Sequence, residues 1–391
     1  MAKLKNFVKF NPVILWLYRF CGAIFVKCLK IFVPINKKKI LFMSFGGKRF
    51  DDSPMVLYNR IKNDADFADY ELVWGFINPK DFDTGCKKVK TDTVKYYIEA
   101  LSAGIWISNS SLERGLHFKR KGNIEINTWH GTPLKKLGCD IEKERGYVNK
   151  KLSSADLFCA QSEFDRDIWV RIFKTQKDKI IISDLPRNDV LTDKAAFNVA
   201  QIKNKLNISP DKKVLLYAPT FREYDRTSSG ACFIAPPIDK EKWKRAFAKD
   251  YIVLVRAHYE TTKIMGIDSD EFFINVSDYP NLNELIAVSD ALISDYSSIY
   301  FDYAITEKPM FNYSYDFEEY EKFRGLYYKP ADIFPCRMNL TEEELIDDIL
   351  SFDADKYVEK VKKFKERFTP NAGHASEIVT EKLKEMIKER R

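Results

Sequence analysis

Residues 126–138, INTWHGTPLKKLG, place one of the chain's four histidines directly after an alternating apolar stretch. Gly131 lets the backbone come close to a ligand, and Pro133 suits the first position of a helix that would carry lysines in its first turn. An imidazole at the edge of a cleft can take a proton from an acceptor hydroxyl. The alternative is a histidine at a helix start that serves only packing. We predict that His130 is a general base and that three neighbours lie on the acceptor side: Gly131, Thr132 and Lys135.

A second polar group stands in the sequence SDYSS, at 294–298, where an apolar run ends and a helix is expected to begin near Ser297. The free N–H groups of a first helical turn, with the hydroxyls of Ser297 and Ser298, form a site for an anion such as phosphate. The alternative is that a serine caps the helix and Asp295 forms a turn. Polar and cationic residues that follow neighbouring strands favour the phosphate interpretation: Thr220, Arg222, Arg256 and His258.

His258 follows an apolar run that should be a buried strand, and Arg256 lies two positions before it. A histidine satisfied inside the core is the usual alternative. The nearby arginine and the strand-end position predict a role beside an anion, because an imidazole can donate to phosphate oxygens near neutral pH. Arg187 and Asp189, in the sequence PRND, either form a plain turn or line the acceptor side.

These side chains can meet only if the strands before them end at the same edge of a sheet. The rest of the chain shows the pattern of strands and helices that such a sheet needs. From Lys39 onward, short apolar runs alternate with amphipathic stretches, which indicates α/β domains with parallel sheets covered on both faces. In such sheets, ligands bind beyond the carboxyl ends of the strands. We expect strands at 40–44, 72–77, 105–107, 124–128, 157–160, 180–182, 214–218, 251–255, 272–276, 291–294 and 310–313, and helices at 341–368 and 374–391.

The length of 391 residues is large for a single core, so two domains are expected. The two blocks of apolar runs meet near 195–210, which predicts an N-terminal domain over 39–200 and a C-terminal domain over 201–391.

Composition narrows the function classes. Seven cysteines form no CxxC pair and the four histidines are scattered, so no metal site is expected. The chain has no Walker loop and no GxGxxG, which counts against an NTPase and a dinucleotide oxidoreductase, and no cofactor is expected. Residues 1–50 hold 11 Lys and Arg and no Asp or Glu, whereas the remainder holds 53 basic and 57 acidic residues. A nucleic-acid-binding protein more often carries its charge over a folded face, so no nucleic-acid partner is expected.

The basic N-terminus includes residues 12–33, PVILWLYRFCGAIFVKCLKIFV, which are apolar apart from Arg19, Lys27 and Lys30. Three cations count against a spanning helix, which needs about 20 mostly apolar residues. Amphipathic helices within residues 1–38 that lie in the headgroup plane of an anionic membrane fit better. The alternatives are helices packed on the first domain, or a true span. The side chains expected in the lipid are Trp16, Leu17, Phe20, Ile24, Phe25, Ile31 and Phe32.

Four stretches, in this order, resemble the CDP-glycerol glycerophosphotransferase family, which builds wall teichoic acids and related polyol-phosphate polymers in bacteria. They are WHGTPLKKLG at 129–138, PRND at 186–189, YAPTFR at 217–222 and SDYSSIYFDYAITEKPMFNY at 294–313. The resemblance covers residues 40–380. It implies a GT-B fold, in which two Rossmann-like domains face each other across a cleft. It also implies that the C-terminal domain binds the donor and the N-terminal domain the acceptor.

By this resemblance His130 and His258 are catalytic, and seven residues contact the donor: Thr220, Arg222, Arg256, His258, Asp295, Ser297 and Ser298. The implied reaction transfers glycerol phosphate from CDP-glycerol to an undecaprenyl-diphosphate-linked saccharide or a polyol-phosphate chain and releases CMP. It would take place at the cytoplasmic face of the bacterial membrane. Three alternatives stay open: a ribitol-phosphate transferase that uses CDP-ribitol, a GT-B glycosyltransferase that uses a nucleotide sugar, and a non-catalytic membrane-surface scaffold.

Overall fold

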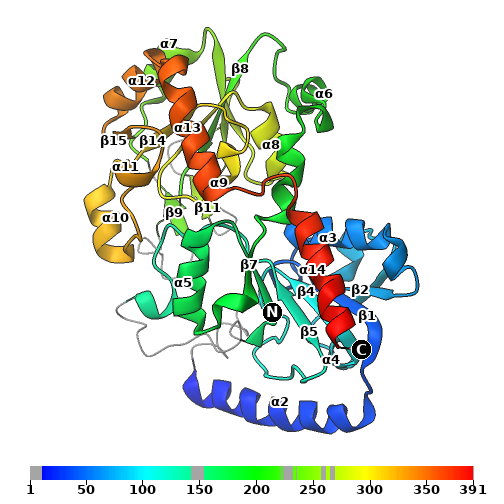
Figure 1. Ribbon diagram of the computed structural model, residues 1–391. Coiled ribbons are helices and arrows are strands. Elements are labelled where there is room, and N and C mark those ends of the chain that lie inside the picture. Colours follow the sequence, from blue (N-terminus) through cyan, green and yellow to red (C-terminus); the bar gives the residue numbers. More distant parts are fainter. Residues whose placement is uncertain are drawn as a thin grey trace.

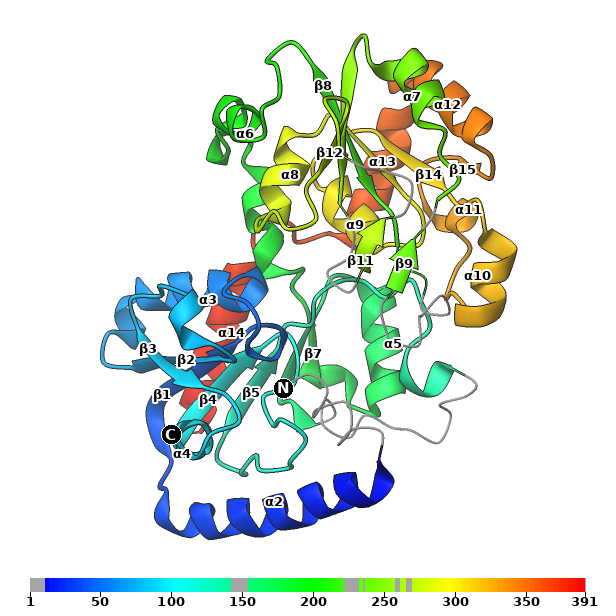
Figure 2. The same cartoon turned by 180° about the vertical axis from the view of Figure 1, so that it is seen from behind.

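The structure, a computed structural model, describes residues 11–141, 154–220, 222, 232–234, 236–256, 261–264 and 269–390. His258 therefore lies outside the described residues. Two lobes stand one above the other, and each is built on a parallel sheet (Figures 1 and 2). The α/β class with two parallel sheets, predicted from the alternating apolar runs, is confirmed.

The first lobe holds a seven-stranded sheet in the order β3-β2-β1-β4-β5-β6-β7, with every pair parallel. All six residues of β4 and all four of β5 are buried, because helices cover both faces of the sheet. The elements are β1 Asn36–Met43, α3 Asp52–Lys62, β2 Glu71–Phe76, β3 Lys87–Lys90, α4 Val94–Ser102, β4 Ala103–Ser108, β5 Ile124–Asn127, β6 Leu157–Ala160, α5 Glu163–Phe173, β7 Ile180–Ile182 and the 3₁₀ segment η8 Pro186–Thr192.

The second lobe holds a six-stranded parallel sheet in the order β12-β10-β8-β13-β14-β15, beside a separate parallel pair of β9 and β11. Two apolar cores lie on opposite faces of the larger sheet. The elements are α6 Val199–Lys205, β8 Lys213–Ala218, β9 Cys232–Ile234, α7 Lys240–Phe247, β10 Tyr251–Val255, β11 Thr261–Ile264, β12 Phe273–Asn275, α8 Leu282–Val288, β13 Ala291–Ser294, α9 Ile299–Ala304, β14 Met310–Tyr313, α10 Phe317–Arg324, α11 Pro330–Ile333, β15 Met338–Asn339, α12 Glu342–Leu350, α13 Ala354–Phe368 and α14 Ala375–Glu389.

The apolar pattern located the central strands but not every edge strand. β3 reads KKVK, and only Val89 of it is buried, so its polarity hides it from a search for apolar runs. The helix predicted over 341–368 is two helices. Thr341 and Glu344 form a capping box at the start of α12, and Asp353 caps α13 by accepting two backbone N–H groups.

The predicted C-terminal domain, 201–391, includes the final helix α14, but this helix packs on the first lobe. Val379, Leu383 and Met386 of α14 are buried in the same apolar core as β1, β2 and β4 of the first sheet. Figures 1 and 2 show α14 beside α3, on the lobe that holds the first sheet. The reason is the amphipathic face of α14, whose apolar side chains are buried against the first sheet. Residues 375–389 therefore pack with the N-terminal domain.

In the described residues, which begin at 11, the helix α2 Pro12–Phe32 precedes the first sheet, and Asn11 caps it by accepting the N–H groups of Val13 and Ile14. One face packs on the first lobe: Val26 is buried, and Phe25 lies edge-on against Tyr97 with ring centroids 5.6 Å apart. Among the described helices, none is long and apolar enough to cross a membrane.

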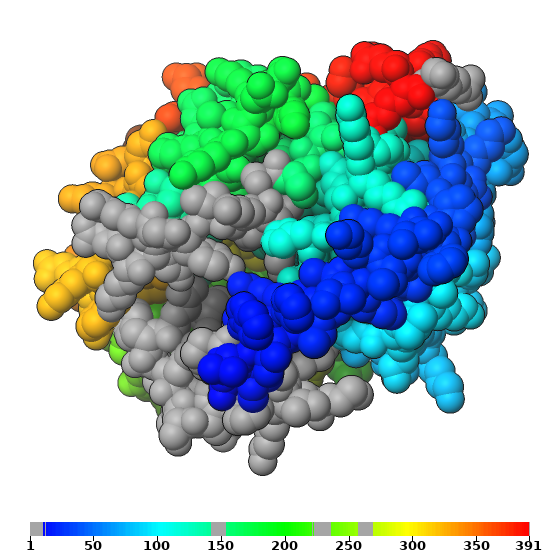
Figure 3. All heavy atoms as spheres, turned by 90° about the horizontal axis from the view of Figure 1, so that it is seen from below, coloured from blue at the N-terminus to red at the C-terminus, as the bar shows by residue number. Residues whose placement is uncertain are grey.

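The opposite face of α2 exposes an apolar row. Its members recur at helical spacing and share one side of the helix; they are Val13, Trp16, Leu17, Phe20, Ile24 and Ile31, with exposed fractions from 46% to 76%. Figure 3 shows α2 lying across the underside of the molecule. The helix α2 therefore packs on the first lobe with one face and exposes an apolar surface on the other. Among the side chains expected in the lipid, Phe25 faces the domain instead.

The placement of α14 predicts which domain it stabilises. Leu383→Ala should lower the free energy of unfolding by about 2–5 kcal/mol, because it empties a buried site. Amide hydrogen exchange should rise in β1 and β4 before it rises in β8 and β13. Leu350→Ala, at a position that is 61% exposed, is the control and should change little. Faster exchange in the second sheet alone would contradict this assignment.

Candidate active site

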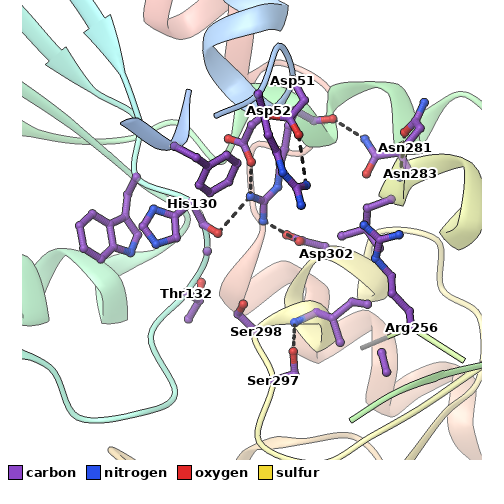
Figure 4. A pocket seen from close by; sticks show the side chains of 18 of the residues that line it. Asp51, Asp52, His130, Thr132, Arg256, Asn281, Asn283, Ser297, Ser298 and Asp302 are labelled. Atoms are coloured by element: carbon purple, nitrogen blue, oxygen red, sulfur yellow. Dashed lines mark hydrogen bonds and ion pairs between the residues drawn. The ribbon is translucent and has the colours of Figure 1, made fainter. Parts of the chain in front are cut away.

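A cavity of about 880 Å³ lies between the lobes, where the strands of both sheets end. Residues that follow β1, β5, β8, β10 and β13 line it, as the strand-end rule predicts. Nine of the predicted site residues line this cavity: His130, Gly131, Thr132, Lys135, Arg187, Thr220, Arg256, Ser297 and Ser298. Figure 4 shows several of them around the cavity, on elements of both lobes.

His130 is held at its ring nitrogen Nδ1, and no hydrogen bond to Nε2 occurs among the residues that the structure describes. Its Nδ1 lies 2.9 Å from the carbonyl oxygen of Asn109, and the ring stacks on Trp129 with centroids 4.4 Å apart. A carbonyl oxygen only accepts, so Nδ1 carries the proton and the neutral ring keeps the lone pair of Nε2 for a proton. The side chain is accessible from the cavity, but the surrounding protein atoms exclude much of the water that would otherwise solvate the ring. This desolvation lowers the pKa of His130, although Asn109 and Asp52 oppose the change.

The residue after the histidine brings the two lobes into contact. Gly131 has φ of +144°, and a Cβ atom there would lie 2.8 Å from Oγ of Ser298 in the second lobe. Only glycine permits this approach. Thr132 is buried, and its hydroxyl contacts Gln161 Oε1 at 2.8 Å and Asp165 Oδ2 at 3.1 Å. Thr132 thus anchors the loop to the first lobe.

The helix expected to begin at Pro133 does not form. Lys135 instead pairs as an antiparallel bridge with Leu326 of the second lobe, and the N–H of Lys136 donates to the carbonyl of Gly325 at 3.0 Å. The N–H of Tyr327 donates to the carbonyl of Leu134 at 2.8 Å. These bonds satisfy the backbone outside a helix, and they join the segment after His130 to the opposite lobe.

The serine turn and Arg256 form the wall opposite His130. The helix α9 begins at Ile299, later than predicted, and the hydroxyl of Ser297 accepts the N–H of Ile299 at 3.3 Å. Arg256 donates Nη1 to the carbonyls of Val276 at 3.2 Å and Tyr279 at 2.8 Å. Burial, together with the charge of nearby Arg49, lowers the pKa of Arg256 to about 10. The burial of Arg256 and its closeness to Arg49 both suit a bound anion, because an anion would offset the positive charges of the two arginines.

Arg222 and Asp295, predicted to contact a donor, do not line the cavity. Arg222 is 2% exposed and pairs with Asp295 at 2.9 Å and with Asp316 at 2.6 Å. Asp295 also accepts the backbone N–H of Thr220 at 2.9 Å and that of Tyr296 at 2.7 Å. The pair therefore holds the two strand-end turns in place from behind.

Asp189, predicted on the acceptor side, lies behind the cavity as well. Its carboxylate accepts the N–H groups of Ala375 and Ser376, each at 2.8 Å, at the start of α14. An acidic group at a helix N-terminus satisfies free donors and complements the helix dipole. The contact also explains why the PRND sequence lies next to the C-terminal helix.

Several residues that line the cavity were missed from the sequence. Arg49, Asp51 and Asp52 follow β1, and Asp302 lies in α9. Burial, with the charge of Asp52 beside it, raises the pKa of Asp51 to about 6. The strand-end rule could have found the first three, because they follow the first apolar run. An acidic residue inside the apolar stretch IYFDYA is the signal for Asp302, which is 2% exposed.

No group of three or more His, Cys, Asp or Glu side chains that could hold a metal ion occurs in the part of the chain that the structure describes.

The fold and the cavity define a protein of two α/β lobes with a ligand-sized cleft between the ends of two parallel sheets. UDP-GlcNAc 2-epimerase from Neisseria meningitidis bound to UDP-GlcNAc has a similar fold. The TM-score is 0.56 at 12% identity, over 89% of this chain and 100% of that chain, so this likeness concerns the fold alone.

The chain belongs to the CDP-glycerol:poly(glycerophosphate) glycerophosphotransferase family, whose family model matches residues 25–385. This confirms the family predicted from the sequence. The structure of the wall teichoic acid polymerase TagF is similar with a TM-score of 0.80 and 31% identity, over 91% of this chain and 90% of that chain. A histidine-to-asparagine variant of that polymerase was also solved after a soak with CDPG.

Curated relatives of the chain include glycerol-phosphate enzymes and ribitol-phosphate enzymes of teichoic-acid synthesis. It is 32% identical over 374 residues to the teichoic acid poly(glycerol phosphate) polymerase of Staphylococcus epidermidis, covering 91% of this chain and 52% of that protein. It is 31% identical over 368 residues to the teichoic acid glycerol-phosphate transferase of Staphylococcus aureus, covering 89% and 93%. The chain thus spans about half of the first relative and most of the second. The ribitol-phosphate polymerase TarK of Staphylococcus aureus matches 57% of this chain at 33% identity.

The contacts of His130 predict its titration. Because desolvation lowers its pKa, the imidazole should titrate below the ordinary value of about 6.5. An NMR titration of the histidine ring protons, with His130→Asn to assign the signal, measures this value. A pKa above 6.5 in the free protein would contradict the neutral, Nδ1-protonated ring.

Proposed function

We propose that the chain transfers glycerol phosphate from CDP-glycerol to a lipid-linked teichoic-acid or polyol-phosphate acceptor and releases CMP. Membership of the glycerophosphotransferase family and the CDPG soak of the TagF variant support the donor. The observation that carries the proposal is His130, whose Nδ1 is committed to Asn109 and whose open nitrogen faces a cleft between two domains. A GT-B arrangement, with donor and acceptor on opposite domains, is part of this proposal.

In the proposed reaction, Nε2 of His130 takes the proton from an acceptor hydroxyl as its oxygen attacks the β-phosphorus of CDP-glycerol. The bond from that phosphorus to the oxygen bridging the two phosphates breaks, and its electron pair leaves with CMP. The products are CMP, the acceptor extended by one glycerol phosphate, and a protonated His130. A lowered pKa keeps the base neutral before the reaction and ready to return its proton to water afterwards.

The opposite wall would stabilise the charge that develops on CMP. Arg256, Thr220 and the hydroxyls of Ser297 and Ser298 line the cavity on the second lobe. Preorganised cations and hydroxyls act strongly in a cleft with little water. Arg222 and Asp295 would contribute by fixing these turns. His258 remains a proposed catalytic and donor-binding residue outside the described part of the chain, and Lys135 a proposed acceptor contact.

Glycerol is favoured over ribitol as the transferred group. Four glycerol-phosphate polymerases and transferases match 89–91% of the chain. A glycerol-phosphate primase matches 66%, and the ribitol-phosphate primase and polymerases match 57–67%. The proposed donor is therefore CDP-glycerol.

We also propose that the protein acts at the cytoplasmic face of the bacterial membrane, where a lipid-linked acceptor is held. The exposed apolar row of α2 supports this location, and the same helix carries three cations, Arg19, Lys27 and Lys30. Apolar side chains in the headgroup region, with cations beside anionic lipid, are typical of helices that lie in the membrane plane.

The reaction is tested by replacing the base. His130→Ala should lower CMP release from CDP-glycerol, with a lipid-linked disaccharide acceptor, by about 100-fold or more, which is a usual effect of removing a general base. CDP-ribitol is offered in parallel to identify the donor. His117→Ala removes an exposed histidine and should leave turnover unchanged. Full turnover in His130→Ala would reject the base, and release from CDP-ribitol alone would reject the donor.

The membrane proposal is tested on the surface of α2. Phe20→Ser with Ile24→Ser should weaken binding to phosphatidylglycerol vesicles by about tenfold or more, because burial of each such side chain contributes about 1.5–3 kcal/mol. Leu340→Ser with Leu350→Ser removes two exposed apolar residues elsewhere and serves as the control. Equal loss in both double variants would argue against a specific membrane face.

A further inference from the structure

One arginine at the cleft shares its charge between the two lobes. Arg187, at the start of η8, donates Nη1 to Asp52 Oδ2 and Nη2 to Asp302 Oδ2, both at 2.7 Å. Asp52 belongs to α3 of the first lobe and Asp302 to α9 of the second. The side chains of Arg187, Asp52 and Asp302 are 13%, 7% and 3% exposed. In Figure 4, dashed lines at Asp52 and Asp302 mark these ion pairs.

Neighbouring side chains make further hydrogen bonds between the two lobes. Asn188 donates its Nδ2 to the other oxygen of Asp302 at 2.6 Å, so both oxygens of that carboxylate are bound by the first lobe. Asn283, from α8 of the second lobe, donates to the carbonyl of Arg187 at 2.6 Å. Arg187 and Asn188 therefore meet the second lobe through two helices, with charge-assisted bonds that need defined geometry.

The same guanidinium reaches the proposed base. Nη1 of Arg187 donates to the carbonyl oxygen of His130 at 3.0 Å. On the other side, Asp302 lies four positions after Ser298, one turn further along the same short helix. The base and the serine turn are thus joined by a path of three groups: the His130 carbonyl, the Arg187 guanidinium and the Asp302 carboxylate.

We propose that Arg187 and Asp302 form an interdomain latch that positions His130 against the Ser297–Ser298 turn. Both are positioning residues, since they act through the groups that they hold. The proposal rests on the proposed function, and it adds a positioning role to the predicted acceptor contact of Arg187. Two carboxylates and a carbonyl accept three of the five N–H donors of its guanidinium. Without the latch, the two walls of the cleft would keep their own groups but lose their fixed separation.

The test compares kinetics of the full chain in variants that break the latch. Asp302→Asn removes the charge at nearly constant size and should lower kcat for CMP release about 10- to 100-fold, because small misplacements of reacting groups cost this much. The KM for CDP-glycerol should change by less than about threefold, because uniform donor binding is not removed. Arg187→Gln should lose a similar factor, and the double variant should be no worse than the worse single variant, as for residues that act as a unit.

A matched control is Glu99→Gln. Glu99 is a carboxylate that is 8% exposed and pairs with Lys39 and Lys87 within the first lobe, away from the cleft. This variant should lower the thermal midpoint and keep kcat. If a neutral variant does not fold, Arg187→Lys replaces it. Lysine keeps the charge but lacks the fork that holds two carboxylates, so the same loss of kcat is expected.

Two results would overturn the latch: an unchanged kcat in Asp302→Asn with a thermal midpoint lowered as in Glu99→Gln, or losses in the two single variants that multiply in the double. If the wild-type chain releases CMP from neither donor, the proposed function fails, and small-angle X-ray scattering then decides on the latch alone. Asp302→Asn should increase the radius of gyration relative to wild type and to Glu99→Gln. An unchanged radius would overturn the proposal.

Discussion

The cleft depends on guanidinium groups that are buried between pairs of carboxylates. Arg222 lies between Asp295 and Asp316 within the second lobe, and Arg187 lies between carboxylates from the two different lobes. Burial alone would lower the pKa of each arginine, but the neighbouring carboxylates outweigh it and raise both pKa values. A charge out of water is tolerated only with close partners, so each pairing imposes geometry on the turns around it.

Backbone connections strengthen this geometry. The segment after His130 pairs with residues 325–327 of the second lobe, and the final helix crosses back to the first sheet. Asp189 caps that helix directly after the residues that carry the interdomain ion pair. One short sequence, PRND, therefore contributes to the cleft wall, the contact between the lobes and the return of the chain. A tetrapeptide that favours a plain turn in the sequence therefore contacts both lobes and the final helix.

The sequence predicted the parts of the site that follow from local pattern. Apolar runs located the central strands, and the rule that parallel strands present ligand-binding groups at their carboxyl ends brought His130, Thr220, Arg256 and Ser297 to one cavity. The sequence could not predict which polar side chains face the cavity, because that depends on partners far away along the chain. Arg222 looks like a donor contact until Asp316 is seen beside it, and a helix after Pro133 is reasonable until Leu326 supplies a backbone partner.

The path of the final helix has a consequence for biosynthesis. The first sheet is translated early, yet part of its apolar covering consists of Val379, Leu383 and Met386. During synthesis on the ribosome, that surface of the nascent N-terminal lobe stays uncovered until residues 375–389 have left the exit tunnel. Domains usually complete their folding one after another as they emerge. Here the core of the lobe that is synthesised first is completed only by the last helix of the chain, so it is completed after the second lobe has been synthesised.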